Sequence, residues 1–335
     1  MSDQPTIRAK GPTDLLALVP GFLGFHPEDS VVVITVGDAR HAFHARVDLP
    51  DDPVGVEDLA TYLTEVATRN GVKQVAVVLY TEDAGLAEAV AGELVGRLLL
   101  AGIDVVCCVR ADGRRWWCLD GRPDDPGTVY DLRSHPLMAQ TVVDGTVVLD
   151  SRRQLADTLV GTDAEETERV ATLADEVVAR LAGVFDPSLG PATTRHQLGL
   201  EGRWVRRRVC RFLDDGERLD AHDAARLATL VTLSLEVRDV AWAEMSHCNA
   251  DQHVTLWRDL VRRVPPHVRA APAALLGFAA WLSGDGALAW CAVECAQEAE
   301  PGYGLAGLLT QALAGAVPPS SWRPIPPESL TLFGG

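Results

Sequence analysis

The sequence predicts an α/β domain followed by an all-helical domain, and three patterns support this division. Mainly apolar runs of strand length occur at residues 30–36, 72–80 and 103–109, as expected for strands covered on both faces. Segments in which apolar residues recur with helical spacing separate these runs. From residue 151 onward the spacing is helical almost throughout. We therefore expect the α/β domain to comprise residues 1–150.

Strands are expected to alternate with helices in the first domain. The run at 30–36 leads through a Gly-Asp turn into residues 41–49, whose alternating apolar and polar side chains indicate a strand with one solvated face. Helices with apolar stripes over 56–66 and 86–98 precede the other two apolar runs, and an Asp-Gly turn leads into a last strand at 114–119. This ββαβαββ order predicts a mixed, mostly parallel sheet covered by helices.

The segment from Thr13 to Gly37 is expected to organise the first domain. A short helix is predicted to end at Pro20, because proline cannot continue it. An apolar elbow follows, in which Gly24 is expected to need a positive φ or a close backbone approach. A turn then enters the first apolar strand, and it either caps that strand or presents functional groups. The candidate residues of this strand-entry turn are His26, Glu28, Asp29 and Ser30.

The helical domain is predicted over residues 151–316, and a proline-rich tail over residues 317–335 is expected to pack as an extended strap or to be loose. One continuous helix is expected near 221–246. Small and helix-ending residues between 273 and 301 follow the pattern of a tetratricopeptide-like helix pair, although two large aromatic positions of that pattern hold alanine. An ordinary helical hairpin is the alternative.

Composition restricts the classes of function. The chain has 335 residues, of which 47% are hydrophobic, and a net charge of −17. This charge opposes general binding to nucleic acid or to an anionic membrane surface. Seven cysteines without a framework spacing predict a reducing compartment, and no apolar run reaches the ~18 residues of a membrane span. We therefore expect a cytoplasmic protein without a signal segment.

Polar residues follow each of the expected buried strands. In open α/β sheets ligands bind at the carboxyl ends of the strands, so these residues are expected to converge if the strands run parallel. Their mixture of acids and arginines suits a polar or phosphorylated ligand, and a solvated rim is the alternative. The candidate ligand-binding residues are Asp38, Arg40, Glu82, Asp83, Arg110 and Arg114.

Arginines cluster near residue 207 of this acidic chain. Arg203, Arg207 and Arg211 are spaced by four residues, which places them on one face of a helix. Such a face either holds an anion or an acidic partner, or pairs with the protein's own carboxylates. We expect the internal pairing. Arg238 and Asp239 are expected to form a partly buried ion pair in the same domain.

Sequence motifs for several common chemistries are missing. No glycine-rich phosphate loop follows an apolar run, and neither Gly-x-Ser-x-Gly nor His-Glu-x-x-His occurs. Cys291, Cys295, His247 and Cys248 could in principle ligate zinc, but structural zinc sites normally show two tight ligand pairs. We expect these thiols to pack between helices, and we predict no metal site and no cofactor. No catalytic residue can be named.

Residues 22–30, Phe-Leu-Gly-Phe-His-Pro-Glu-Asp-Ser before an apolar strand, resemble the start of an uncharacterised actinobacterial family, domain of unknown function 4192. Residues 237–239 and 275–289 are also similar to that family, so the resemblance covers nearly the whole chain. It implies no activity, ligand or catalytic residue.

The sequence favours a non-catalytic binding or scaffold protein whose helical domain is a surface for a protein partner. The alternative is an enzyme or sensor that binds a small polar or phosphorylated ligand at the carboxyl-terminal edge of the sheet. A deep polar pocket with converging acids and arginines would favour this alternative.

Overall fold

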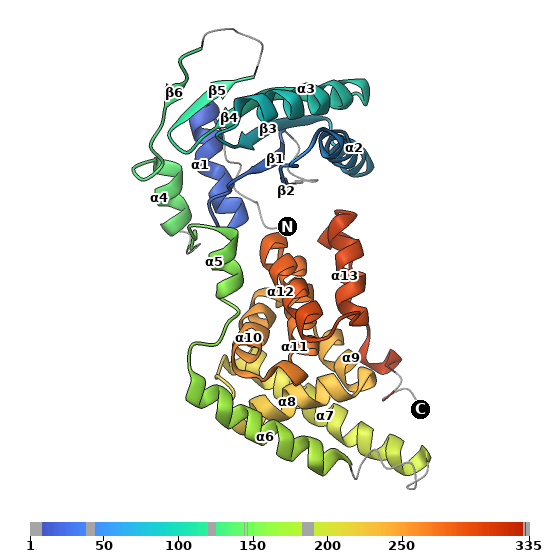
Figure 1. Cartoon of the computed structure of the whole chain (residues 1–335). Helices are drawn as coiled ribbons and strands as arrows, with labels where there is room; N and C mark the ends of the chain where they lie inside the picture. The colour runs from blue at the N-terminus through green and yellow to red at the C-terminus, as the bar shows by residue number, and fades with distance from the viewer. Residues whose placement is uncertain are drawn as a thin grey trace. The chain divides into compact units, whose positions relative to one another are not determined.

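The computed structural model describes residues 9–37, 44–119, 125–143, 145, 147–182, 191–330 and 332. The chain forms two compact units, Met1–Arg152 and Arg153–Gly335. Unit 1 combines a six-stranded sheet with helices, and unit 2 is helical apart from its connections (Figure 1). Each unit buries apolar side chains of its own.

A mixed six-stranded sheet forms the centre of unit 1. Its strands are β1 (Ser30–Thr35), β2 (His44–Asp48), β3 (Gln74–Tyr80), β4 (Asp104–Ala111), β5 (Arg115–Cys118) and β6 (Thr128–Val129). They lie in the order β2-β1-β3-β4-β5-β6. Strand β1 pairs antiparallel with β2 and β3, and β5 pairs antiparallel with β4 and β6. Strands β3 and β4 pair in parallel.

The expectation of a mostly parallel sheet is wrong, and the connections explain why. Helix α2 (Pro53–Arg69) joins β2 to β3, which run in the same direction but have β1 between them. Because β1 and β2 form a hairpin, β1 runs opposite to both of its neighbours. Helix α3 (Ala84–Leu100) joins β3 directly to its hydrogen-bonded neighbour β4, and this crossover gives the parallel pair of the described sheet.

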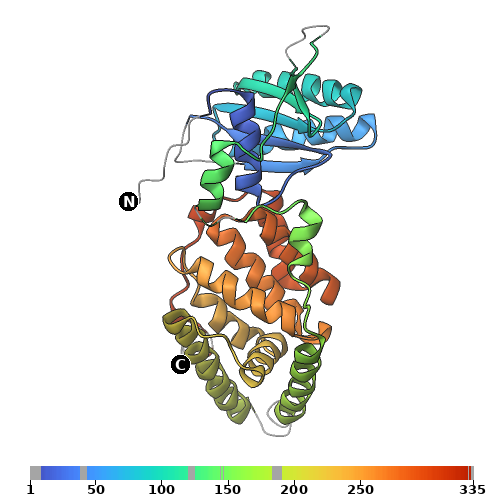
Figure 2. The ribbon, with the colours of Figure 1, turned by 90° about the vertical axis from the view of Figure 1, so that its left-hand side faces the viewer.

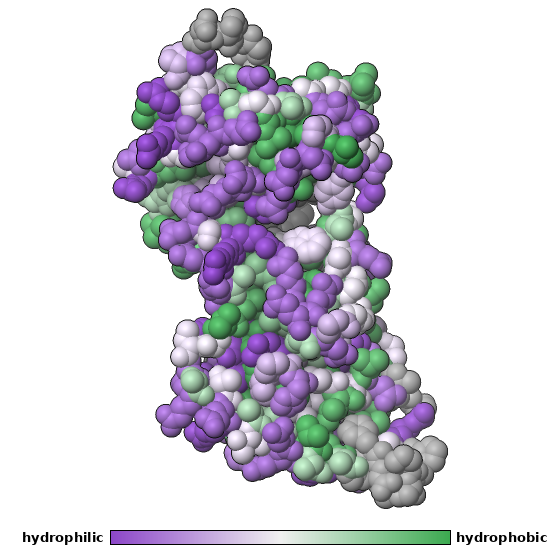
Figure 3. Space-filling view, in the orientation of Figure 1, coloured by the Kyte–Doolittle hydropathy of each residue, from purple (hydrophilic) through white to green (hydrophobic). Residues whose placement is uncertain are grey.

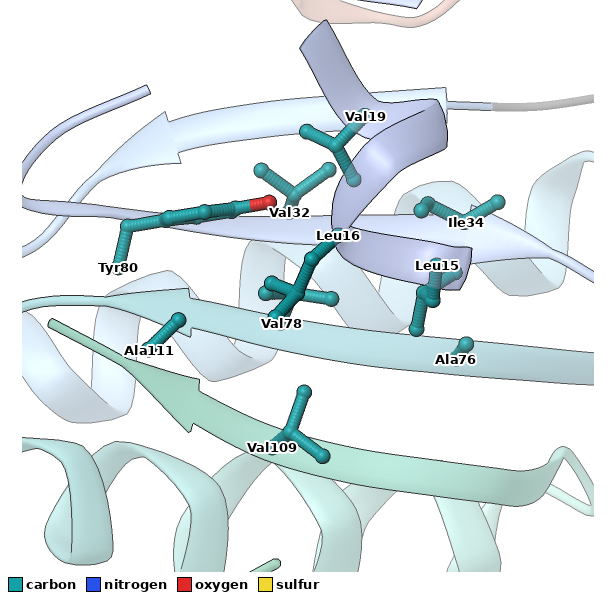
Figure 4. Packing of buried hydrophobic residues seen from close by; sticks show 10 residues of the cluster. All are labelled: Leu15, Leu16, Val19, Val32, Ile34, Ala76, Val78, Tyr80, Val109 and Ala111. Carbon is teal, nitrogen blue, oxygen red and sulfur yellow. The ribbon is translucent and has the colours of Figure 1, made fainter. Parts of the chain in front are cut away.

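Helices cover both faces of the sheet. Helix α1 (Pro12–Leu23) lies on one face, and α2 and α3 lie on the other (Figure 4). Side chains of α1 interdigitate with alternate residues of β1, β3 and β4. This cluster contains Leu15, Leu16, Val19, Val32, Ile34, Ala76, Val78, Tyr80, Val109 and Ala111. The apolar runs are strands because both of their faces are covered.

Helix α1 does not end at Pro20, contrary to the prediction. It continues to Leu23, since the buried Pro20 removes one backbone N–H close to the helix end, where the loss is small against the packing of α1. Gly24 ends the helix with φ 75°, and its N–H donates to the Pro20 carbonyl at 2.8 Å. The predicted positive φ is confirmed. No heavy atom lies within 4 Å of a Cβ built on Gly24, so conformation rather than space requires glycine.

Unit 2 is a set of packed helices (Figure 2). They are α6 (Ala164–Ala182), α7 (Pro191–Asp215), α8 (Ala221–Leu233), α9 (Leu235–Ala243), α10 (Ala250–Arg263), α11 (Ala270–Ser283), α12 (Gly286–Ala299) and α13 (Gly304–Ala314), with short 3-10 turns η3 (Pro266–Val268), η4 (Pro319–Ser321) and η5 (Pro327–Ser329). The short helices α4 (Pro136–Val143) and α5 (Arg152–Asp157) lie between the sheet and α6 in the sequence.

The single helix predicted over 221–246 is two helices, because Ser234 interrupts it. This residue is extended, with φ −137° and ψ 118°, and its hydroxyl accepts a hydrogen bond from the N–H of Val237 at 3.3 Å. Serine favours this capping role over a helix interior, since its side chain competes for backbone groups. The break separates α8 from α9.

Two contacts within unit 2 position its helices, and the second of them, the ion pair of Arg238 and Asp239, was predicted. A Cβ on Gly277 of α11 would lie 3.3 Å from the Ala289 carbonyl of α12, so glycine permits the close approach of these helices. Arg238 and Asp239 form a partly buried ion pair, with 2.7 Å between Nη2 and Oδ1. Arg238 also donates to the Tyr303 hydroxyl at 3.3 Å, which ties α9 to the start of α13.

Candidate functional site

The structure brings several candidate residues together at one edge of the sheet. Because β3 and β4 are parallel, their carboxyl ends meet there, and the Thr81 N–H donates to the Ala111 carbonyl at 3.0 Å. Ser30 pairs in register with Tyr80, so the strand-entry turn reaches the same edge from β1. The sequence indicated these groups separately, and the sheet register places them side by side.

Arg110 is the best-buried charged group at this edge, with 9% of the residue exposed. Its guanidinium lies over the Trp117 ring, 3.8 Å from the ring centre. Its Nη1 donates to the carbonyls of Glu82 at 3.1 Å and of Thr81 at 3.4 Å. Arg110 therefore holds the loop between β3 and α3 against β5, in addition to any contact that it could offer a ligand.

The acids beside Arg110 are also engaged with the protein's own backbone. The Asp83 carboxylate accepts from the N–H of Leu86 and caps α3. Burial raises the pKa of Asp112, but the N–H groups of Arg115 and Arg114 and the charge of Arg110 outweigh it and lower the pKa overall. The Glu82 and Arg114 side chains are exposed. The edge is therefore mainly a set of loop contacts, with few groups that face outward.

Asp38 and Arg40 were expected to join this site, and both lie outside the described residues. The described residues that immediately precede Asp38 lie at the other end of the strands, away from Arg110. The Val36 N–H donates to the carbonyl of Gln74, the first residue of β3, at 2.9 Å. Since β1 is antiparallel to β3, β1 ends at the edge opposite to Arg110, so the expected convergence through parallel strands does not apply.

The strand-entry turn is fixed by its backbone. The His26 N–H donates to the Leu149 carbonyl at 2.9 Å, and the Asp29 carbonyl accepts from the Leu49 N–H at 2.8 Å. Asp29 has φ 38°, while the Glu28 and Asp29 side chains are exposed. These contacts fit the capping interpretation of the turn.

Two buried hydroxyls beside the turn have no hydrogen-bond partner among the described residues. They are Ser30 Oγ and Tyr80 Oη, on neighbouring strands. Burial, with a smaller contribution from Tyr130, raises the pKa of Tyr80 well above its ordinary value, so this phenol stays protonated. The Tyr80 ring points into the cluster under α1 (Figure 4).

A shallow groove on the outer side of α2 and α3, of about 660 Å³, was not predicted. Its lining residues are Thr61, Thr64, Glu65, Thr68, Arg69, Arg97, Leu100 and Ala101. The three threonine hydroxyls donate to carbonyls of their own helix, and Arg97 pairs with Glu57 and Glu93. The threonine spacing on an exposed helical face could have revealed the groove, but its donors are largely used within the protein.

The arginine stripe, defined as Arg203, Arg207 and Arg211, lies on the solvent-exposed face of α7. On the other face Val205, Val209 and Phe212 are buried, which fixes the rotation of the helix. Hydrophilic and hydrophobic residues are mixed over the visible surface of the molecule (Figure 3). The three arginines thus share one face of α7, as predicted, and this face is exposed to solvent.

The expected internal pairing is made by the arginines next to the stripe instead. Arg206 Nε lies 2.7 Å from a Glu244 carboxylate oxygen, and Arg208 Nε lies 2.7 Å from one of Asp223. Within the described part of the chain, no carboxylate lies within 4.0 Å of the Arg203 or Arg207 guanidinium. Arg211 has a loose contact of 3.6 Å with Asp215, one turn along the same helix.

The model of one protein family, described as Domain of unknown function (DUF4192), matches residues 12–320. The chain belongs to this family. The resemblance seen in residues 22–30 is thereby confirmed, and the match includes parts of both units. No curated protein and no solved structure matches the chain. The family description names no activity, so the function has to be argued from the geometry of this DUF4192 member.

Two cysteine thiols of this DUF4192 member have raised pKa values. Burial raises the pKa of Cys108 to about 12, and burial together with Glu244 raises that of Cys210 to about 11, which keeps these thiols protonated. Cys291 is buried, while His247 and Cys248 are exposed. Among the described residues, no three His, Cys, Asp or Glu side chains are grouped to hold a metal. In the same part of the chain, no helix is long and apolar enough to cross a bilayer.

Proposed function

We propose that this chain is a non-catalytic binding or scaffold protein whose helical unit docks an acidic protein segment on the arginine stripe. The observation that carries the proposal is that Arg203 and Arg207 are exposed without a carboxylate within 4.0 Å among the described residues. The chain as a whole has a net charge of −17, so carboxylates for internal pairing are abundant. Arg203 and Arg207 are therefore available to an external anion.

The geometry of the stripe suits a carboxylate-bearing segment. Side chains one helical turn apart are separated by roughly 5–6 Å at Cβ, which is also the spacing of acidic residues along a partner helix. Guanidinium groups bind carboxylates through two parallel hydrogen bonds. A nucleic acid is a poorer candidate, because its long phosphate chain would extend past three arginines onto an acidic protein.

The hairpin of α11 and α12 gives further support to a binding role. Its close approach at Gly277 and Ala289 occurs where a tetratricopeptide-like pair has small residues, and such pairs commonly build surfaces for partners. None of the seven cysteines forms a disulfide, which agrees with a reducing cytoplasm as the place of action.

The alternative of an enzyme or sensor at the sheet edge has less support. Arg110 holds carbonyls of its own loop, and Asp83 caps its own helix. A ligand at this edge would have to compete with these contacts or use the exposed Glu82 and Arg114 side chains.

Titration with a fluorescent polyglutamate peptide at several salt concentrations tests the proposal. We expect the wild-type chain to bind it, and the triple variant Arg203→Gln, Arg207→Gln, Arg211→Gln to lose most of the binding. The matched control replaces three scattered exposed arginines: Arg153, Arg169 and Arg262. Equal loss in both triple variants would reduce the effect to net charge and refute the proposal. Preference for duplex DNA over polyglutamate would refute a protein partner.

A further inference from the structure

The beginning of the proline-rich tail, residues 317–322, is docked on the helices of unit 2, and we call it the strap. Trp322 stacks on Trp242 of α9, with 5.5 Å between ring centres and 19° between planes. Its ring also meets the edge of Phe278 of α11 at 4.8 Å. Trp281 Nε1 donates to the Val317 carbonyl at 3.0 Å. The strap is thus held by one aromatic anchor and one hydrogen bond to its first residue.

The turn that connects α13 to the strap holds a non-glycine residue in the left-handed region. Ala316 has φ 45°. Its N–H donates to the Leu313 carbonyl at 2.9 Å, and the Val317 N–H donates to the Ala312 carbonyl at 2.9 Å. This hydrogen-bond pattern is the Schellman motif, in which the left-handed position normally holds glycine. The alanine Cβ makes this turn strained.

We propose that two copies of this chain exchange their straps, so that Trp322 of each copy occupies the aromatic groove of the other. The groove consists of Trp242, Phe278 and Trp281. The strap of a second copy has the same sequence, so it can make the same contacts with the groove as residues 317–322 make within one copy. Only the connection to α13 differs between the two arrangements. That connection includes Ala316, whose strain is imposed by the turn back onto the same copy. A strap that extends away relieves it, and strained short hinges favour such exchange.

Concentration decides between the two arrangements. Within one copy the strap is presented to its groove at a high effective concentration, so the closed monomer prevails in dilute protein. At roughly 0.5 mM chain the second copy competes with this internal presentation. The inference concerns a surface separate from the arginine stripe, so it stands or falls independently of the proposed function.

A complementation experiment with full-length chains tests the exchange. Trp322→Ala removes the anchor and leaves the groove, and Trp242→Leu alters the groove and leaves the anchor. We expect each variant alone to run as a monomer in light scattering after size exclusion, and an equimolar mixture to give a species of twice the mass. If both variants unfold cooperatively and their mixture stays monomeric, the proposal is overturned.

A second experiment tests the strap exchange if the Trp242→Leu chain does not fold. Wild-type chain is incubated at high concentration, beside the Trp322→Ala and Ala316→Gly chains, and the dimer fraction is then measured. We expect a several-fold smaller dimer fraction in both variants, because the first lacks the anchor and the second relieves the strain inside the monomer. A wild-type chain that stays monomeric, or variants that dimerise to the same extent, would overturn the exchange.

Discussion

Arg110 in unit 1 and Arg203 of the arginine stripe in unit 2 have one property in common. Within the described residues, neither side chain has a carboxylate within 4.0 Å. Their surroundings differ. Arg110 is buried over Trp117 and donates to two loop carbonyls, whereas the stripe is exposed on α7. The lack of a counter-ion therefore does not by itself indicate a binding site. What matters is whether the protein already uses the donors.

The largest effect on the free energy of unfolding is expected at a buried, ion-paired arginine. Arg263 is 4% exposed and lies 2.6 Å from Glu166, 2.8 Å from Asp259 and 2.8 Å from the Leu219 carbonyl. Arg263→Met leaves Glu166 without its partner and Asp259 with Arg218 alone, and we expect a loss of about 3–5 kcal/mol in the free energy of unfolding. Urea unfolding measures it, with the exposed neighbour Arg262→Met as the control. Equal effects of the two changes would contradict the contrast between inward and outward arginines.

The contrast between buried and exposed groups should also appear in the pH dependence of stability, through the buried His253. His253 accepts from the Trp257 indole N–H at 3.3 Å, and burial lowers its pKa from 6.5 to about 4. Below pH 6.5 the unfolded chain therefore binds a proton that the folded chain takes up only near pH 4. Stability should fall over this interval by about 3 kcal/mol from this group. Urea unfolding from pH 7 to pH 4 checks it: His253→Gln should flatten the dependence, while the exposed His196→Gln should leave it unchanged.

An intermediate effect is expected at the sheet edge. Arg110→Gln removes the donors to the Thr81 and Glu82 carbonyls, and we expect a loss on the order of 1–3 kcal/mol in unfolding free energy. Thermal unfolding measures it, with Arg114→Gln as the exposed control. If Arg110→Gln melts like the wild type, the loop contacts do not stabilise the fold, and this result would favour a ligand-binding role for Arg110.

A smaller and opposite pair of effects is expected at two helix ends. Gly24 and Ala316 both have positive φ, at 75° and 45°. Gly24→Ala should lower the unfolding free energy by about 1 kcal/mol, and Ala316→Gly should raise it by a similar amount. Calorimetric melting at low protein concentration compares the two variants with the wild type. A change of the same sign in both would show that local packing, rather than backbone conformation, governs these positions.

The sequence predicted the two kinds of structure because burial pattern is a local property. The apolar runs became strands, and the segments with helical spacing between them became α2 and α3. Strand direction could not be predicted, since alternation of side chains is the same in parallel and antiparallel pairs. It depended on β1 lying between β2 and β3, which no local pattern records.

The candidate sites were predictable to the same limited extent. Spacing placed Arg203, Arg207 and Arg211 on one helical face, but which arginines are neutralised depends on where Glu244 and Asp223 arrive from other helices. Proline content likewise predicted a tail that packs as an extended strap or is loose, and only the fold brings Trp322 to its groove. Long-range packing decides both questions.

Urea unfolding of the triple variant Arg203→Gln, Arg207→Gln, Arg211→Gln, with polyglutamate binding measured on the same sample, distinguishes a stripe that binds a partner from a stripe that is paired within the protein. The stripe is exposed, and within the described chain its one ion pair is the 3.6 Å contact between Arg211 and Asp215, so we predict an unfolding free energy within about 0.5 kcal/mol of the wild type, together with lost binding. A loss of more than about 2 kcal/mol with binding intact would refute the proposed binding role of the stripe, because it would mean that the stripe is neutralised by the protein itself.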